Sequence, residues 1–581
     1  MDTTQPGDGS AQRRAVESRA VAWLAARRDL IDPAHAAPDR VLFARKALLE
    51  TAFLVGLRAR LDPAPLEDDY AALLDTIEDI AARPSYRELI ARDEAALLLY
   101  AGTYAALRLC GREDPEFRTV IQQAAAGGYA AVFERIPYRQ LDLLHTLELC
   151  GIPHTLPSMA DVLPFTLLHN SPNALKLADR DIYALTHTIF YATDFGLRRP
   201  HGPRSFDPGA AVELLEALLV LTRSQGNADL VGELLCCLLC LGVRDSEEAG
   251  RAWEFLLSVQ EADGRVNGPE GVVHPGLTDG DDAYRHWATG YHTTIVAALA
   301  ALLDRSPKVL RTARPAAPEC RQEVRQPLRR AVEWLASTVR RHDPARWLPA
   351  AAAAAHAADA LGEPELTRPL LLDFSERLAD ADDAVWQAHG MEVVGAFVSG
   401  LREHGITCVS LDRFLKSTAA AVELLDTVPH QAVPSVQRLA GLGLLSPGRA
   451  AALTGGAVAQ PAPPEPAAGD LPEAWKNYHL GQVAGIVRDL ARSGAAAHRL
   501  TRDAVGFLLA QQSPCGAFGR PACDDPEDRE RAMLSWTQST VTALAAVHTA
   551  RGPAATPGGA TASSGAGASG AGASGAGAPA R

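Results

Sequence analysis

The sequence lacks any apolar run long enough to cross a membrane. Its 581 residues contain no stretch of 18 apolar residues without a polar or charged break, and the nearest run, from Leu234 to Leu241, is typical of a buried helix turn. The N-terminal residues do not show the apolar core and small-residue cleavage site of a secretory signal. We therefore expect a cytoplasmic protein, in which the nine irregularly spaced cysteines are reduced thiols.

Basic residues and nucleotide-binding motifs are also scarce. Lys and Arg number 56 against 70 Asp and Glu, giving a net charge of −14, whereas binding to a phosphate backbone needs clustered basic residues. No Walker A motif, dinucleotide-binding glycine motif or nucleophile elbow occurs in a suitable context. We expect no nucleic-acid partner and no nucleotide cofactor; no cofactor is evident, although a divalent metal is possible.

The residues that favour helices are abundant, and those that favour strands are few. Hydrophobic residues make up 47% of the chain, much of this Ala and Leu, while aromatic residues make up only 6%. Apolar residues recur at helical spacing, as in residues 214–221, and prolines fall between such runs, where helices must stop. No segment alternates with the period of a strand. The sequence predicts an all-α protein.

One segment of about twelve residues occurs twice. Residues 255–266 read FLLSVQEADGRV and residues 507–518 read FLLAQQSPCGAF, so both carry F-L-L-x-x-Q-x-x-x-G, a helix end followed by a glycine turn. Each copy is followed by a Thr-bearing helix start and an Ala-Leu run, at 291–299 and 536–544. The spacing predicts repeated helical hairpins.

This unit resembles the QW-type repeat of the α/α toroids, which include squalene-hopene cyclases, class II diterpene cyclases and protein prenyltransferase β subunits. In that superfamily the Gln and Gly close the turn between an outer and an inner helix of a ring, and the substrate lies in the central hole. Val266 stands where the repeat usually has Trp, and Phe518 partly restores the aromatic residue. The resemblance implies a terpene-cyclase-like toroid and a hydrophobic substrate, for example an isoprenoid.

The breaks in composition divide the chain into segments. A Pro-Ala-rich stretch is typical of a semi-rigid linker, and the Gly-Ala-Ser repeat at the end is typical of a flexible tail. We expect disorder over 1–11, an N-terminal helical domain over 12–205, toroid hairpins over 206–452, a linker over 453–470, closing toroid hairpins over 471–551 and a disordered tail over 552–581.

The first candidate site is the acidic cluster of Asp279, Asp281 and Asp282, which reads D-x-D-D. The resemblance to class II terpene cyclases implies that such a motif supplies the acid that protonates an alkene. Neighbouring carboxylates repel one another, and this keeps one of them protonated. The alternative is a solvated acidic loop or a helix N-cap.

The second candidate is a stripe of His187, Tyr191 and Asp194, spaced i, i+4 and i+7 along a predicted helix. An imidazole, a phenol and a carboxylate on one stripe suit an acid/base relay or part of a metal site. The alternative is a buried polar network that joins helices.

The third candidate is His292 with the aromatic residues Tyr284, Trp287 and Tyr291 at the start of a repeat helix. By the toroid resemblance this helix start faces the cavity, as does Trp536 in the second copy, and aromatic faces there bind a prenyl chain or a carbocation. The alternative is aromatic core packing. If His187, Asp194 and His292 converge, they form a metal or acid/base centre.

Three functions fit this sequence. The first is a biosynthetic enzyme that acts by acid/base chemistry on a hydrophobic small molecule, and the second is a protein that modifies or binds a ribosomal peptide. The Ala-rich composition and Gly-Ala-Ser tail resemble those of actinobacterial proteins of secondary metabolism, which supports both. The third is a helical-repeat scaffold without catalysis. The oligomeric state is open.

Overall fold

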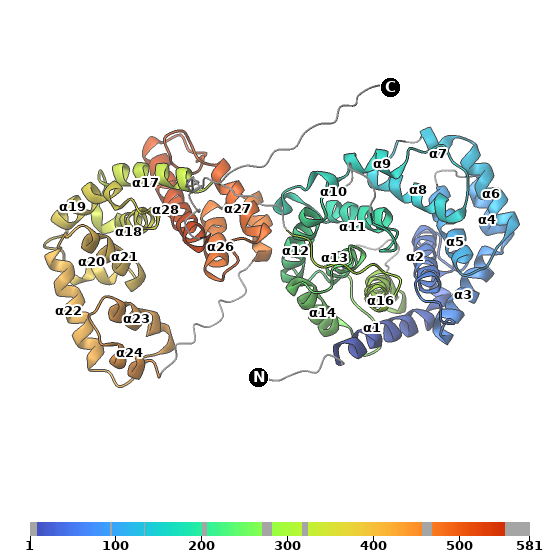
Figure 1. The fold of residues 1–581 in the computed structure, drawn as a ribbon, viewed down its shortest axis with the longest axis horizontal. Helices are drawn as coiled ribbons and strands as arrows, with labels where there is room; N and C mark the ends of the chain where they lie inside the picture. Colours follow the sequence, from blue (N-terminus) through green and yellow to red (C-terminus); the bar gives the residue numbers. More distant parts are fainter. Residues whose placement is uncertain are drawn as a thin grey trace, which may run out of the picture.

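A computed structural model describes residues 8–92, 96–132, 134–199, 206–269, 282–316, 323–455 and 468–551. These ranges are helical, and the pairings between extended residues that they contain are two isolated bridges. The prediction of an all-α protein is confirmed for this part of the chain. Figure 1 shows two groups of helices, α1 to α16 and α17 to α28.

The predicted disorder over residues 1–11 includes residues that are helical in the structure. Residues 1–7 lie outside the described residues, but α1 (Asp8–Ala25) already includes residues 8–11. Val16 and Ala20 in this helix are fully buried, and a helix anchored in this way extends upstream at little cost. The predicted tail over 552–581 and residues 456–467 of the predicted linker lie outside the described residues.

Six helices of the first half contact one another in cyclic order, so that each packs against the next and the last packs against the first (Figure 1). These inner helices are α2 (Val41–Leu61), α5 (Leu97–Leu109), α8 (Pro137–Cys150), α11 (Asp179–Thr193), α13 (Ala228–Cys240) and α16 (Tyr291–Arg305). The predicted division after residue 205 therefore runs between helices that pack directly on each other, because α11 contacts α13, and α2 contacts α16.

The remaining helices of this half pack outside the six. Besides α1, which contacts α16 and α3, they are α3 (Asp68–Ala81), α4 (Pro84–Arg92), α6 (Pro115–Ala126), α7 (Tyr129–Val132), α9 (Met159–Val162), α10 (Leu167–Asn170), α12 (Pro208–Ser224), α14 (Glu247–Val259) and α15 (Asp282–Ala288). The 3-10 turns are η1 (Arg28–Ile31), η3 (Leu163–Phe165) and η4 (Ala174–Lys176).

The second half forms an arc in which α26, α28, α18, α21 and α23 pack in that order (Figure 1). Its helices are α17 (Arg325–Val339), α18 (Pro344–Leu361), α19 (Arg368–Arg377), α20 (Asp383–Gln387), α21 (Met391–Glu403), α22 (Val409–Glu423), α23 (Val433–Gly441), α24 (Pro447–Leu453), α25 (Leu471–Lys476), α26 (Leu480–Arg492), α27 (Arg499–Ala510) and α28 (Pro526–Arg551), with turns η5 (Pro364–Leu366), η6 (His430–Ala432) and η7 (Ala468–Asp470). The two halves meet where α12 and η4 contact α27, and Arg502 pairs with the buried Glu213 at 2.6 Å across this contact.

The repeated glutamine closes the same turn in both halves. Gln260 donates from Nε2 to the carbonyl oxygen of Gly264 at 3.0 Å and to that of Val16 on α1 at 3.1 Å. Gln512 donates to the carbonyl oxygen of Gly516 at 3.0 Å and to that of Pro327 on α17 at 2.7 Å. Each glutamine thus joins its turn to the first helix of its own half.

The first helices of the two halves share a sequence as well as a position. Residues 19–25 of α1 read RAVAWLA and residues 330–336 of α17 read RAVEWLA. A Cβ atom added to Gly264 would lie 2.1 Å from the carbonyl oxygen of Arg19, and one added to Gly516 would lie 2.4 Å from that of Arg330. The shared turn, helix and close approach identify the two halves as internal repeats.

Replacing Gly264 by Ala should destabilise the first half by about 3 kcal/mol. The residue has a φ of 99°, and its new methyl group would overlap the backbone of α1. The matched control is Gly250→Ala in α14, where an added Cβ meets no atom within 4 Å and should stabilise the helix by up to about 1 kcal/mol. Urea unfolding followed by circular dichroism measures both changes. Equal stability of the two variants would contradict the proposed close approach.

Candidate functional site

A compartment of about 430 Å³ lies toward the N-terminal ends of the inner helices, and we call it the polar compartment because ionisable side chains are frequent in its lining. Lys46 and Glu50 of α2, Arg139 of α8, His187 of α11 and His292 of α16 contribute to its lining. Asp229 lies in the first turn of α13, where the partial positive charge of the helix N-terminus stabilises its carboxylate.

A second compartment of about 160 Å³ adjoins the first and is mainly apolar. Its lining includes Phe53 and Leu57 of α2, Phe190 of α11, and Ile295 and Leu299 of α16. The side chains that line both compartments are Glu50, Arg139, His187, Glu233 and His292. A molecule that fills both spaces would therefore place the junction of its polar and apolar parts beside these ionisable groups.

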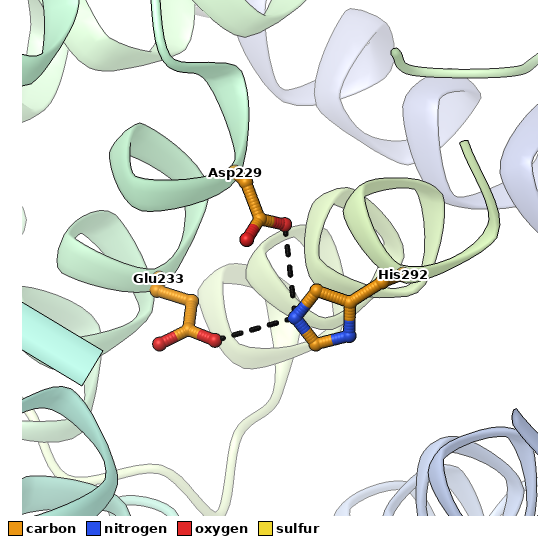
Figure 2. Close-up of side chains that lie close together, drawn as sticks. All are labelled: Asp229, Glu233 and His292. Carbon is orange, nitrogen blue, oxygen red and sulfur yellow. Dashed lines mark ion pairs between the residues drawn. The ribbon is translucent and has the colours of Figure 1, made fainter. Parts of the chain in front are cut away.

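Three ionisable side chains at or beside this junction are arranged around a common point: Glu233 and His292 line both compartments, and Asp229 lines the polar one. Asp229 and Glu233 lie one turn apart on α13, and His292 is the second residue of α16 (Figure 2). One ligand atom from each residue lies within 4.8 Å of the other two. His292 Nε2 is 3.7 Å from Asp229 Oδ1 and 3.5 Å from Glu233 Oε1.

Neighbouring side chains hold the two carboxylates in place. Thr293 donates a hydrogen bond to Asp229 Oδ1 at 2.9 Å, and the hydroxyl of Tyr183 donates to the other oxygen of Asp229. Thr186 donates to Glu233 Oε2. Side-chain exposure is 4% for Asp229 and 3% for Glu233, so both carboxylates are buried and held by hydrogen bonds.

His292 is oriented by its other ring nitrogen. Nδ1 donates to Glu50 Oε2 at 3.2 Å, which directs Nε2 toward Asp229 and Glu233. Burial alone would lower the pKa of His292, but the carboxylates of Asp229 and Glu50 outweigh it and raise that pKa well above its ordinary value. Burial would raise the pKa of Glu50, but the charges of Lys46 and His292 hold it below its ordinary value. The cluster therefore has a strong preference for a positive charge at its centre.

His187, predicted from the sequence, lies in the same cavity as His292. Its Nδ1 lies 2.8 Å from the carbonyl oxygen of Tyr183, to which it donates, and 3.6 Å from Glu233 Oε2. With Nδ1 carrying the proton, Nε2 is the nitrogen that can accept one. The structure thus brings together two of the three residues whose convergence the sequence left open.

Asp194 is the residue of that set that does not join the cluster. It lies one residue beyond the end of α11, in a left-handed conformation with a φ of 50°, so the predicted stripe over His187, Tyr191 and Asp194 is wrong at its last position. Its carboxylate accepts two hydrogen bonds from Arg60 at 2.7 and 2.6 Å and a third from His145 at 2.9 Å. Asp194 therefore connects α2, α8 and α11.

The predicted aromatic residues are divided between the cavity and the core. Tyr291 lines the polar compartment and Tyr191 the apolar one. Tyr284 and Trp287 are buried and pack around Phe43. Trp536 lies in the second half, where its ring packs on Tyr478.

The acidic motif is only partly described. Asp279 and Asp281 lie outside the described residues, and Asp282 is the exposed first residue of α15.

Sequence reasoning missed Asp229 and Glu233, together with Lys46 and Glu50. A signal for the first pair was present, because two acidic residues four apart interrupt the otherwise apolar α13 and fall on one helix face. A buried carboxylate needs a partner, so such a pair indicates a polar or metal-binding face.

The family described as a domain of unknown function (DUF6895) matches residues 17–302, a range that begins in α1 and ends in α16. No curated protein matches the chain, and no solved structure does. Within the described residues, no helix combines the length and apolar character needed to cross a bilayer.

Proposed function

We propose that the first half is an α/α toroid and that its central cavity is the active site of a divalent-metal-dependent enzyme. The observation that carries the proposal is the cluster of Asp229, Glu233 and His292, of which Glu233 and His292 lie at the junction of a polar and an apolar compartment. The cyclic packing of six helices around this cavity supports the toroid, as does the glutamine-closed turn of the repeat.

The distances in the cluster suit a metal ion. Two ligand atoms that each lie about 2.1 Å from a tetrahedral zinc ion are about 3.4 Å apart. The separations of 3.5 and 3.7 Å from His292 Nε2 to the two carboxylates are close to this value. Metal-bound histidines usually donate their second ring N–H to a carboxylate, as His292 does to Glu50. Three protein ligands leave a coordination position for substrate or water.

The chemistry of the site combines this ion with His187. A divalent cation polarises a carbonyl or phosphoryl oxygen, or acidifies water, when it is bound. His187 lines both compartments beside Glu233, and its Nε2 can take up or return a proton during the reaction. Burial of the site within the inner helices limits the access of bulk water to the reacting group.

The lining of the two compartments indicates the class of substrate. Lys46, Arg139 and Arg180 surround the polar compartment and suit an anionic or strongly polar group. The apolar compartment suits a short hydrocarbon part, for which an isoprenoid chain qualifies. We therefore propose an amphipathic small molecule as substrate.

A comparison of metabolite turnover tests this function. Full-length protein loaded with Zn²⁺ or Mn²⁺ is incubated with an extract of small metabolites, and the extract is analysed by mass spectrometry. The wild type and Glu254→Gln, an exposed carboxylate variant on α14, should consume the same amphipathic compound, whereas Glu233→Gln should not. Consumption by Glu233→Gln at the wild-type rate would contradict the proposed active site.

Replacing Glu50 by Gln should weaken metal binding by about 10- to 100-fold, because the residue orients His292 without itself belonging to the three-residue cluster. Calorimetric titration of chelator-treated protein with Zn²⁺ measures the change, with Glu254→Gln as the matched control. An unchanged affinity in Glu50→Gln would show that His292 is not held through this contact.

A further inference from the structure

The repeat places the two halves in register. Gly226, Gly242 and Gly264 have positive φ values of 70°, 84° and 99°, and the residues 252 positions later, Tyr478, Gly494 and Gly516, have values of 59°, 86° and 103°. This common spacing aligns α13 with α26. It is independent of the side chains that form the metal cluster.

The second half has lost the cluster at the aligned positions. The same spacing places Gly481 at the position of Asp229 and Gly485 at that of Glu233. The helices that follow the two turns align through Thr294 and Thr537. The hydroxyl of Thr294 accepts a hydrogen bond from the backbone N–H of Val266, and that of Thr537 accepts one from the backbone N–H of Phe518, both at 2.9 Å. That alignment places Ser535 at the position of His292. The described part of the second half thus has no equivalent of the three proposed ligands.

The concave side of the second half is instead basic. A hollow of about 750 Å³ between α21, α23 and α26 is lined by Arg438 and Arg492, and an adjoining one of about 210 Å³ adds Arg488 and His356. Glu392 is the carboxylate in both linings, and it pairs with Arg492 at 2.8 Å while both side chains remain more than half exposed. Arg488 pairs with Asp489 at 3.0 Å, and burial lowers the pKa of His356. Three guanidinium groups therefore face two carboxylates, which leaves one positive charge in excess on this surface.

The rest of this surface is a mixture of small apolar and hydroxyl or amide side chains. Ala352, Ala396 and Leu442 are among the apolar members, and Ser399 and Gln538 are among the polar ones. In the described part of the chain, α23 and α26 both line the hollow but do not pack closely on each other. The hollow is therefore open between these two helices. Its volume exceeds what one small anion fills, and its mixed lining suits alternating charged and apolar groups.

We propose that this concave surface binds an acidic polypeptide segment, with its carboxylates on Arg438, Arg488 and Arg492. Guanidinium groups pair with carboxylates in a bidentate manner, and a net excess of positive charge attracts such a segment to an otherwise acidic protein. This binding is independent of the metal site.

Fluorescence anisotropy with a labelled peptide of about a dozen residues, half of them Glu and the rest Ala, Leu and Gly, tests the proposal on the full-length protein. The double variant Arg438→Glu/Arg492→Glu should bind the peptide at least tenfold more weakly than the wild type. The matched control is Arg413→Glu/Lys416→Glu, which reverses two exposed charges on α22 and should bind as the wild type does. A peptide with Gln in place of Glu should bind at least tenfold more weakly.

Three results would overturn the proposal. The first is an absence of peptide binding, and the second is an equal loss of affinity in the α22 control. The third is that tripolyphosphate binds as tightly as the peptide and displaces it, which would assign the surface to a small anion. Glu233→Gln should bind the peptide normally, so failure of the metal site and failure of this surface are distinguishable. Circular dichroism confirms that the charge-reversal variants are folded.

Discussion

Replacing Asp194 by Asn should lower the free energy of unfolding of the first half by about 3 kcal/mol at neutral pH. The carboxylate, with 13% of its side chain exposed, carries a bidentate ion pair with Arg60 and a hydrogen bond from the buried His145. Removing one partner of a buried pair leaves the other charge without compensation. Asn retains the side-chain shape and tolerates the positive φ, so the change isolates the charge.

The effect of this substitution should depend on pH. Burial would raise the pKa of Asp194, but the hydrogen bonds and charges of His145 and Arg60 outweigh it and hold the pKa below its ordinary value. A carboxylate with a lowered pKa stabilises the fold above its unfolded pKa of about 4, and this contribution is lost as the pH falls. The difference between wild type and Asp194→Asn should therefore shrink below about pH 4.

Urea unfolding at neutral and acidic pH measures this difference. The control is Asp282→Asn, an exposed position whose replacement should change stability by no more than about 0.5 kcal/mol. Zinc affinity should be the same in wild type and Asp194→Asn. If Asp194→Asn lost zinc binding and kept its stability, Asp194 would belong to the metal site and would have no structural role.

Replacing His292 by Ala should weaken zinc binding by at least about 100-fold, more than the loss of a residue that only orients a ligand. His292 supplies the nitrogen that faces both carboxylates of α13. The matched control is His356→Ala, which removes a histidine from the concave side of the second half. It should leave the affinity unchanged in a calorimetric titration.

The same two variants give a result without metal. In the chelator-treated protein, His292→Ala leaves Glu50, Asp229 and Glu233 without the imidazole that lies between them. Unpaired carboxylates repel one another, so this variant should unfold at lower urea than the chelator-treated wild type, and Zn²⁺ should not restore it. Equal zinc affinity in the two histidine variants would contradict the assignment of His292 as a ligand.

Helical periodicity was sufficient to predict the fold class, because it depends on residues near one another in the sequence. The glutamine and glycine of the repeated turn were also recognisable, and Gln260 and Gln512 make the turn-closing bonds in the structure. The cyclic order of the inner helices was not predictable in this way. The contacts of α2 and α1 with α16 join residues more than 200 positions apart, and no local pattern records them.

The candidate site was predicted in part for a related reason. His187 and His292 were recognisable as polar residues in apolar helices. Asp229 and Glu233 were overlooked because they directly precede the apolar run from Leu234 to Leu241, which was interpreted as a buried helix turn. Asp194 was predicted to lie on the helix because a glycine usually marks a helix end, and the nearest glycine, Gly196, lies two residues beyond it. The helix in fact ends at Thr193, and Asp194 itself has a positive φ. The partners Arg60 and His145 are distant in sequence, so their contact with Asp194 required the folded chain.

Anomalous diffraction from crystals of the full-length protein grown with Zn²⁺, with data collected on both sides of the zinc absorption edge, tests the metal site most directly. We expect an anomalous peak bounded by the carboxylates of Asp229 and Glu233 and by Nε2 of His292. A zinc-saturated crystal with no peak at this position, or with His292 Nε2 in direct hydrogen-bond contact with the carboxylates in its place, would contradict this expectation.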